Sequence, residues 1–284
     1  MFRSIAVPAG NIAWLLLAAA VLAIGGEHSR AEVIFSDDFA YANGVLAGNS
    51  GGTGWAGAWS GGTSQVTAGL PDTAGTSVRI SSEASVTSRL LNATISTGGA
   101  DTYFISFLFN AAPFSPPENG DYAGISLVGG GDSLFMGMPG SSGKLGFDWR
   151  NEGDGLFAAA SSTTYLTLFE LKPASTAGRT VVNMYATTDL LMSGSALAGG
   201  TALASLEGPN FSFSSVEIAG GYATPDSISV AGLAMATSAD EAVNITQAVV
   251  PEPSGLLLAG LAVVIRGCGL YRARRQRGDI VPAS

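Results

Sequence analysis

The sequence predicts an all-β protein, an antiparallel β-sandwich flanked by a signal helix at the N-terminus and a transmembrane helix at the C-terminus. Segments rich in β-branched and aromatic residues recur at intervals of about ten to fifteen residues, separated by glycine, serine and proline. Between the two apolar ends, no long stretch combines a 3.6-residue apolar period with helix caps. These observations favour two packed sheets over a helical or mixed fold.

Nine segments are expected to form strands. Several alternate with period two, as in 211–214, where the phenylalanines face one side and the serines the other. In 164–172 both faces are apolar, as expected for a strand covered by a second layer. Segment 189–200 has room for one turn of helix, but its glycines favour a loop. The expected strands are 77–82, 102–110, 122–129, 133–138, 144–149, 164–172, 179–187, 211–220 and 226–237.

The N-terminal end has the layout of a secretory signal peptide. Arg3 supplies a positive charge, 12–24 is apolar, and Ser29 and Ala31 are small residues at the −3 and −1 positions of a cleavage site. A permanent N-terminal anchor is the alternative. The sequence therefore divides into a signal peptide, a β-sandwich domain and a C-terminal sorting segment, predicted at 1–31, 32–247 and 248–284.

The segment between the two apolar ends is strongly acidic. From Glu32 to Val250 it holds six basic and nineteen acidic residues, a net charge of −13. Such a surface repels phosphate backbones, which excludes nucleic acid as an expected partner. The acidity suits solubility outside the cell and the binding of cations.

The single histidine and the single cysteine both lie outside the predicted sandwich domain. His28 is in the signal region and Cys268 is in the C-terminal apolar run. The domain therefore cannot form a Ser-His-Asp triad, a Cys-His pair or a zinc site built on these residues. It also cannot form an internal disulfide, so its stability must come from core burial.

The C-terminal end combines a Pro-Glu-Pro, an apolar run and an arginine cluster. Segment 254–271 would span about 27 Å as a helix, just short of a ~30 Å hydrocarbon core. Arg266 interrupts this run but lies close enough to one end to snorkel. The arginine cluster orients that end toward the cytoplasm and leaves the Pro-Glu-Pro outside, in extended geometry. The motif and the cluster comprise Pro251, Glu252, Pro253, Arg272, Arg274, Arg275 and Arg277.

This three-part tail resembles the PEP-CTERM sorting signal, also described as an ice-binding-protein C-terminal domain. The resemblance implies that an exosortase-type membrane protease-transpeptidase reads the tail, and that the protein reaches the cell surface, the envelope or an exopolysaccharide matrix. Arg266 inside the apolar run and 278–284 after the cluster depart from the family pattern. A plain stop-transfer anchor is the alternative, so both cleavage and retention of the tail stay open.

The central domain resembles concanavalin-like, laminin-G-like jelly rolls of exported bacterial proteins. The resemblance rests on FSDDFAYANGVLAGNSGGTGWAGAWSGG (35–62), on AGISLVGGGDSLFMGMPGSSGKLGFD (123–148) and on PDSISVAGLAMATSADEAV (225–243). It implies that the first segment opens the domain with a strand and a glycine- and tryptophan-rich loop. It also implies that the last segment is a closing strand that returns to pair near the first.

Two pairs of residues near the start of the domain are candidates for binding. Asp37 and Asp38 could ligate a structural Ca²⁺ together with backbone carbonyls, and a solvated pair at a strand start is the alternative. Trp55 and Trp59 could form a platform on which sugars stack. The alternative for these tryptophans is that they fill the sandwich core beneath the glycine loop.

The sequence offers little support for catalysis. A glycoside hydrolase needs two carboxylates on either side of the bond that it cleaves. The pairs Glu152 with Asp154 and Glu118 with Asp121 lie in glycine- and proline-containing turns. We therefore expect a non-enzymatic, exported surface or exopolysaccharide-matrix protein whose sandwich either binds glycans weakly or makes structural contacts. A concanavalin-like glycoside hydrolase or lyase is the alternative.

Overall fold

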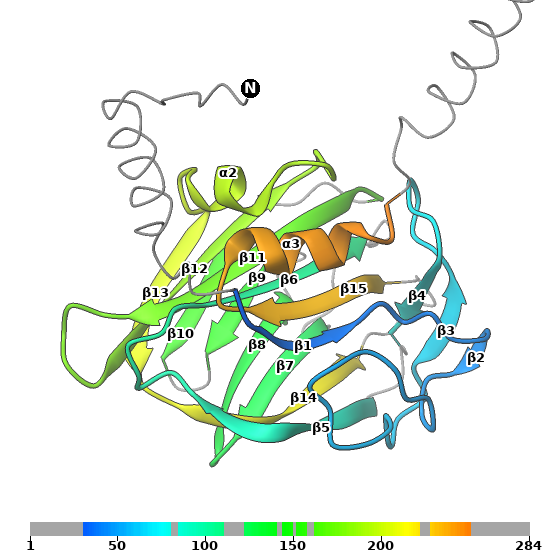
Figure 1. Cartoon of the computed structure of the whole chain (residues 1–284), viewed down its shortest axis with the longest axis horizontal. Coiled ribbons are helices and arrows are strands. Elements are labelled where there is room, and N and C mark those ends of the chain that lie inside the picture. The colour runs from blue at the N-terminus through cyan, green and yellow to red at the C-terminus, as the bar shows by residue number, and fades with distance from the viewer. Residues whose placement is uncertain are drawn as a thin grey trace, which may run out of the picture. The chain divides into compact units, whose positions relative to one another are not determined.

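The computed structural model describes residues 31–80, 85–110, 122–140, 144–149, 152–157, 162–221 and 228–250. The chain separates into two units, Met1–Glu32 and Val33–Ser284, and the following description concerns the second. Among the described residues of this unit, two antiparallel sheets pack face to face and two short helices accompany them (Figure 1). The predicted β-sandwich is therefore confirmed.

The larger sheet has nine strands in the order β13-β12-β11-β6-β15-β4-β3-β2, with β1 paired to β15. Because β15 has β6 on one side and both β4 and β1 on the other, it lies at the centre of this sheet. The strands are β1 (Val33–Asp37), β2 (Gly44–Val45), β3 (Gln65–Ala68), β4 (Thr76–Arg79), β6 (Tyr103–Asn110), β11 (Thr164–Pro173), β12 (Arg179–Thr187), β13 (Ala204–Pro209) and β15 (Ser229–Ala236).

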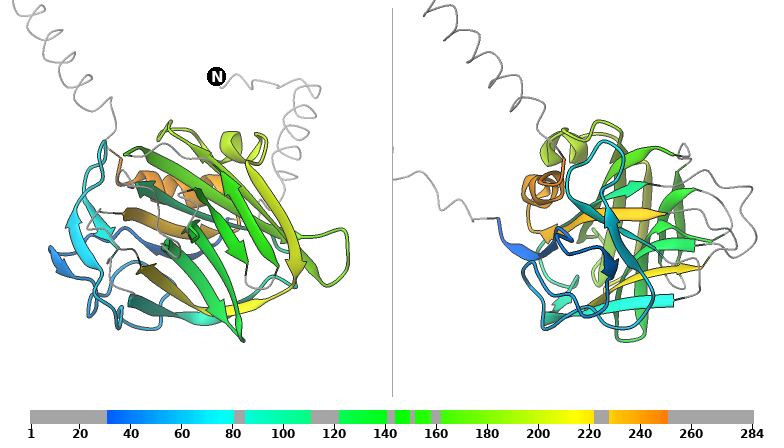
Figure 2. Two further views of the ribbon diagram at one scale, coloured as in Figure 1. Left: turned by 180° about the vertical axis from the view of Figure 1, so that it is seen from behind. Right: turned by 90° about the vertical axis from the view of Figure 1, so that its right-hand side faces the viewer.

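The smaller sheet has six strands in the order β10-β9-β8-β7-β14-β5 and forms the other layer (Figure 2). The core between the layers is rich in aromatic side chains, and Phe107 stacks on Phe169 with ring centroids 5.7 Å apart. The strands are β5 (Ser85–Ser96), β7 (Tyr122–Gly129), β8 (Asp132–Met138), β9 (Leu145–Trp149), β10 (Gly153–Phe157) and β14 (Ser212–Gly221).

The closing strand pairs with the first strand, as the resemblance implied. Ser36 is opposite Ala234 and Asp37 is opposite Leu233. The strand is shorter than the predicted segment, because β15 ends at Ala236 and a helix follows. Within β15, Gly232 has a φ of +56° where the register with β6 shifts, a backbone conformation that glycine adopts without a Cβ penalty.

Helix α3 (Ala239–Gln247) covers a second apolar cluster on the outer face of the larger sheet (Figure 1). Val243 and Val249 pack there with Leu108 and Leu166 of the sheet. This nine-residue helix occupies the last part of the segment 225–243 that was expected to be the closing strand. Its start was readable in the sequence, because Ser238 caps it, accepting from the amide of Glu241, in a Ser-x-x-Glu pattern.

The other short helix is α2 (Gly194–Ala198), within the segment 189–200 that was expected to be mainly a loop. Ser193 caps it by accepting from the Ala196 amide. The helix ends at Gly199, so the glycines of this segment limit it to five residues.

Both chain ends lie largely outside the described residues. The predicted signal peptide at 1–31 and the sorting segment from Pro251 onward are the parts concerned. The candidate carboxylates Glu118 and Asp121 also lie outside the described residues. Within the described ranges, no helix is long and apolar enough to cross a membrane. The predicted transmembrane segment 254–271 is not among them.

Candidate functional site

The loop that follows β1 connects the two sheets. Its backbone bridges Ser36 of β1 at Thr53, and Leu91 of β5 at Trp55. Two glycines let it lie flat against β1: a Cβ on Gly52 would come within 1.8 Å of the Ser36 carbonyl oxygen, and one on Gly54 within 2.0 Å of the Ile34 carbonyl oxygen. Both have positive φ angles, so the glycine-rich stretch is required by backbone packing.

Asp37 is the centre of a buried polar cluster beneath this loop. Its side chain is 0% exposed. Oδ2 accepts from Arg89 Nη1 at 2.7 Å, from the Tyr41 hydroxyl at 2.7 Å and from Trp59 Nε1 at 2.9 Å, while Oδ1 accepts from the Phe39 amide at 2.8 Å. Both carboxylate oxygens therefore have strong protein donors, which offsets the cost of burying the charge.

Arg89 projects from β5 and is 3% exposed. Besides the ion pair, its Nε donates to the Gly57 carbonyl at 2.7 Å. Its guanidinium carbon lies 4.7 Å from the ring centroid of Trp55 and 5.8 Å from that of Trp59. Arg89 thus joins β1, β5 and the loop through charge, hydrogen bonds and cation–π contacts.

Tyr41 is held in its neutral, donating form by this cluster. Burial raises the pKa of its phenol, and the hydrogen bond to the charged Asp37 raises it further. The hydroxyl therefore remains a donor to Asp37 across the physiological pH range.

This geometry argues against a Ca²⁺ ion at Asp37, one of the two residues of the candidate calcium pair. The Arg89 guanidinium occupies the position beside Asp37 that a cation would take, and a Ca²⁺ ion there would be repelled by it. Asp38 is exposed and accepts from the Ala40 amide at 3.1 Å. Among the described residues, no group of three or more His, Cys, Asp or Glu side chains is placed to hold a metal.

The two tryptophans have different environments. Trp59 is 1% exposed, so the core-filling alternative holds for it and a sugar-stacking role is wrong. Trp55 is half-buried, with its ring centroid 4.9 Å from that of Phe35 and its Nε1 donating to the Ser36 carbonyl at 2.8 Å. Trp149 is also in the core, 1% exposed.

Trp55 lines an open pocket of about 550 Å³ between the glycine loop and β5. Exposed Asn92 contributes an amide to its wall, and Arg89 contributes the buried guanidinium. None of its lining residues is acidic. They are Ser50, Gly51, Gly52, Gly54, Trp55, Ala56, Gly57, Ala58, Arg89 and Asn92.

Glu152 and Asp154, which the sequence offers as a candidate catalytic pair, each have a different neighbour in the structure. Glu152 lies 3.9 Å from Arg179, and Asp154 is directly opposite Asp148 in the β9–β10 register. Burial, and then the charge of Asp154, raises the pKa of Asp148. The sequence pattern does not reveal this cross-strand pair, because its members are six residues apart in the chain and meet only when the hairpin forms.

A second polar cluster lies on the outer face of the larger sheet. Oε2 of Glu170 accepts from Asn183 Nδ2 at 2.8 Å, from Lys172 Nζ at 2.9 Å and from the Tyr185 hydroxyl at 3.1 Å. Burial alone would raise the pKa of Glu170, but these hydrogen bonds and the Lys172 charge outweigh it and lower the pKa. Burial and the neighbouring Glu170 charge raise the pKa of Tyr185 to about 12.

Comparison with known proteins yields fold-level similarities alone. No family model and no curated protein matches the chain. Among solved structures, the T. cruzi calreticulin globular domain matches with a TM-score of 0.45 and 10% identity, covering 77% of this chain and 93% of that one. Lectin II from Ulex europaeus matches with a TM-score of 0.36 and 10% identity, covering 61% of this chain and 89% of the lectin.

The binding domain of botulinum neurotoxin serotype D matches with a TM-score of 0.41 and 10% identity over 65% of this chain. The match covers 46% of the toxin domain, so the chain spans about half the length of that protein. Similarities at these scores carry no inference about function.

Proposed function

We propose that this is an exported, non-enzymatic surface or exopolysaccharide-matrix protein whose β-sandwich binds glycans in the Trp55 pocket. The observation that carries this proposal is the open pocket of about 550 Å³ beside a half-buried tryptophan. Its volume falls within the range of about 300–1,000 Å³ typical of small-ligand sites. The exported setting rests on the signal-peptide layout and on the three-part C-terminal tail.

The chemistry of the pocket suits a sugar. An indole offers an apolar surface to the C–H groups of a pyranose ring. The Asn92 amide offers both donors and an acceptor to hydroxyl groups. Arg89 is fixed by Asp37 and Gly57, so little side-chain entropy would be lost when a ligand binds next to it.

A glycan array on the full-length protein in detergent tests the binding site. Asn92→Ala removes a polar wall, and we expect about three- to tenfold weaker binding for the loss of one or two hydrogen bonds. Trp55→Phe keeps a ring against Phe35 but shortens the apolar surface, and should also weaken binding. Asn244→Ala, a change at an exposed asparagine of α3, is the matched control. Unchanged affinity in both pocket variants would remove the Trp55 pocket from the proposal.

We further propose that an exosortase-type enzyme cuts the chain near Pro251-Glu252-Pro253. The chain is fixed just before this motif, because the Ala74 amide donates to the Val249 carbonyl at 2.7 Å and Val249 is 7% exposed. Mass spectrometry of the native protein should find that the sequence after the motif is missing or modified. A cell-surface protein that still ends at Ser284 would refute this processing.

The Asp148–Asp154 pair favours a second candidate, a glycoside hydrolase. Directly opposite residues in a sheet have Cβ atoms about 5 Å apart, near the carboxyl separation of retaining enzymes. The raised pKa of Asp148 suits a general acid, with Asp154 as nucleophile. Release of reducing sugar from polysaccharides, abolished in Asp148→Asn and in Asp154→Asn, would support this function. Equal release by the variants and the wild type would exclude the pair.

A further inference from the structure

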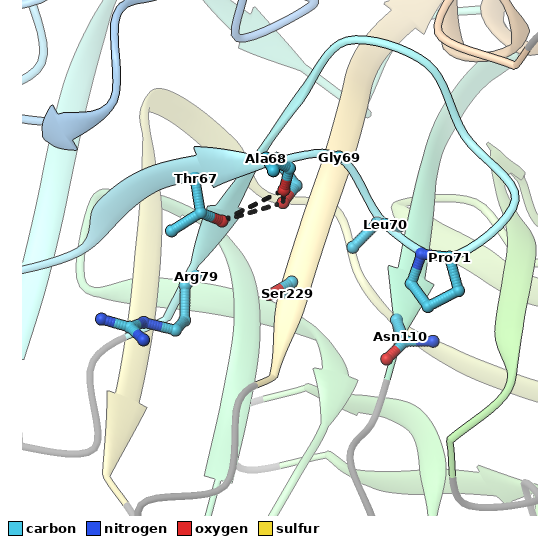
Figure 3. A pocket seen from close by; sticks show the side chains of 9 residues that line it. Thr67, Ala68, Gly69, Leu70, Pro71, Arg79, Asn110 and Ser229 are labelled. Carbon is cyan, nitrogen blue, oxygen red and sulfur yellow. Dashed lines mark hydrogen bonds between the residues drawn. The ribbon is translucent and has the colours of Figure 1, made fainter.

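A second pocket lies on the outer face of the larger sheet, away from the Trp55 loop. Arg79 of β4, Ser229 of β15 and Asn110 of β6 form a row across three neighbouring strands, in register with one another. Figure 3 shows Ser229 between the other two, below the loop at Gly69 and Pro71. The cavity has a volume of about 290 Å³.

The floor of this pocket presents polar groups that are buried and oriented. Asn110 is 8% exposed and Ser229 is 9% exposed. Asn110 Nδ2 donates to Thr164 Oγ1 at 3.0 Å, and Thr164 Oγ1 donates to the Pro71 carbonyl at 3.3 Å. This chain of hydrogen bonds fixes the orientation of the Asn110 amide, so Oδ1 is left as an acceptor. Neither Oδ1 nor the Ser229 hydroxyl has a side-chain hydrogen bond among the described residues.

The upper wall is held in place from two directions. Ser77 Oγ donates to the Ala68 carbonyl at 2.8 Å and lies 3.2 Å from Thr67 Oγ1. The loop after Leu70 is tied to the C-terminal end of the domain by the Ala74 amide, which donates to the Val249 carbonyl. The pocket is therefore largely formed before any ligand arrives, which lowers the entropic cost of binding.

Arg79 supplies a positive charge that the rest of the described structure does not neutralise. Arg89, Lys172 and Arg179 each have a carboxylate partner within 4.0 Å. Arg79 is exposed and forms no ion pair or side-chain hydrogen bond within the described part of the chain. In a domain with a net charge of −13, this guanidinium is a local site for an anion.

We propose that this pocket binds one acidic sugar unit, a uronate, with its carboxylate on Arg79 and its ring hydroxyls on Asn110 Oδ1 and the Ser229 hydroxyl. A guanidinium matches a carboxylate in planar geometry, whereas Asn110 Oδ1 requires a donor from the ligand. A phosphate dianion has one hydroxyl donor on a small tetrahedral ion, whereas a uronate places several ring hydroxyls away from its carboxylate and can reach Asn110 Oδ1 and Arg79 together. The volume is near the lower limit for ligand sites, about 300 Å³, which suits one monosaccharide. The inference rests on the proposed function in that the ligand is a glycan.

Saturation-transfer NMR on the full-length protein in detergent, with D-glucuronate as the probe, tests this site. Glucose is the matched neutral ligand, because it differs from glucuronate only in having a hydroxymethyl group in place of the carboxylate. We expect glucuronate to bind in the millimolar range and glucose and inorganic phosphate not to compete for the site. Arg79→Gln should weaken glucuronate binding about tenfold or more, since a charge-assisted hydrogen bond is lost. Ser229→Ala should weaken it by a smaller factor.

Arg179→Gln is the control, because it removes the same charge from an arginine that is already paired with Glu207. Equal losses in Arg79→Gln and Arg179→Gln would mean that net charge alone attracts the ligand, and would overturn the site. So would competition by phosphate as strong as by glucuronate. If the wild type does not bind glucuronate but binds neutral glycans, and Asn92→Ala weakens that binding, this inference is overturned and the proposed function stands. If the wild type binds neither glucuronate nor neutral glycans, both the proposed function and this inference are overturned.

Discussion

Arg89 and Arg79 are two arginines of the same domain with opposite environments. Arg89 is 3% exposed, with its charge balanced by Asp37 and its Nε bound to Gly57. Arg79 is exposed on the outer face, beside the Ser229 hydroxyl and Asn110 Oδ1, which have no side-chain hydrogen bond among the described residues. The partners of a charged side chain therefore decide whether its charge stabilises the fold or remains free to attract an anion.

The largest effect is expected at the buried ion pair. Arg89→Met leaves the Asp37 carboxylate buried without its counter-charge, and should lower the free energy of unfolding by about 3–5 kcal/mol. Asp37→Asn should destabilise to a similar extent. Urea unfolding of the full-length chain measures both. The double variant should lose much less than the sum of the two single losses, because the two residues share one interaction. Additive losses would show that the pair is not coupled.

Glu170 provides an intermediate case, since it is partly buried and its partners lower its pKa. A folded-state pKa below the unfolded value of about 4.3 stabilises the protein above that pH, and the contribution is lost as the pH falls through the folded-state pKa. Glu170→Gln should therefore cost about 1 kcal/mol at pH 7 and little at pH 2. Unfolding curves at the two pH values measure this. An equal loss of unfolding free energy at pH 7 and pH 2 would show that the contribution of Glu170 does not come from its charge.

The Asp148–Asp154 pair should give a smaller effect of opposite sign. The pKa of Asp148 is raised in the folded state, so the pair costs stability once the pH exceeds that pKa. Asp154→Asn removes one charge and should stabilise the protein by about 0.5 kcal/mol at pH 7. The gain should disappear at acid pH, where both carboxyls are protonated. Thermal unfolding across this pH range would refute the prediction if the variant were less stable at pH 7.

The smallest effect on stability is expected for Arg79→Gln. Its side chain has no partner in the described part of the chain, so the free energy of unfolding should change by less than about 0.5 kcal/mol. Urea unfolding beside Arg89→Met gives the direct comparison. A loss above about 1 kcal/mol would show that Arg79 is structural, like Arg89.

Much of the sandwich could be predicted from local patterns. Strands β6, β7, β11 and β12 match the expected segments within about one residue, because their apolar residues are continuous or alternate cleanly. Strand β5 was not predicted, since Thr87 and Arg89 face inward while Val86 and Leu90 face outward, the reverse of the usual apolar-inward alternation. Helix α3 was missed because a strand pattern leads directly into it.

The sites were less predictable than the strands. The sequence offers Asp37 with Asp38 as a candidate calcium pair or as a solvated pair at a strand start, and local sequence does not reveal its actual partner. Its partner Arg89 is 52 residues away and arrives only through the packing of β5 beside the loop. In the same way, Arg79, Ser229 and Asn110 meet through strand register, which local sequence patterns do not encode.

The central contrast is tested most directly by one measurement, the stabilisation of Arg79→Gln by D-glucuronate in urea unfolding of the full-length chain. A ligand at ten times its dissociation constant stabilises the native wild type by about 1.4 kcal/mol. We predict that Arg79→Gln has wild-type stability without ligand and, because its binding is tenfold weaker or more, gains about 0.4 kcal/mol or less from the ligand. A variant that is strongly destabilised, or that is stabilised by glucuronate as much as the wild type, would show that Arg79 does not hold the ligand.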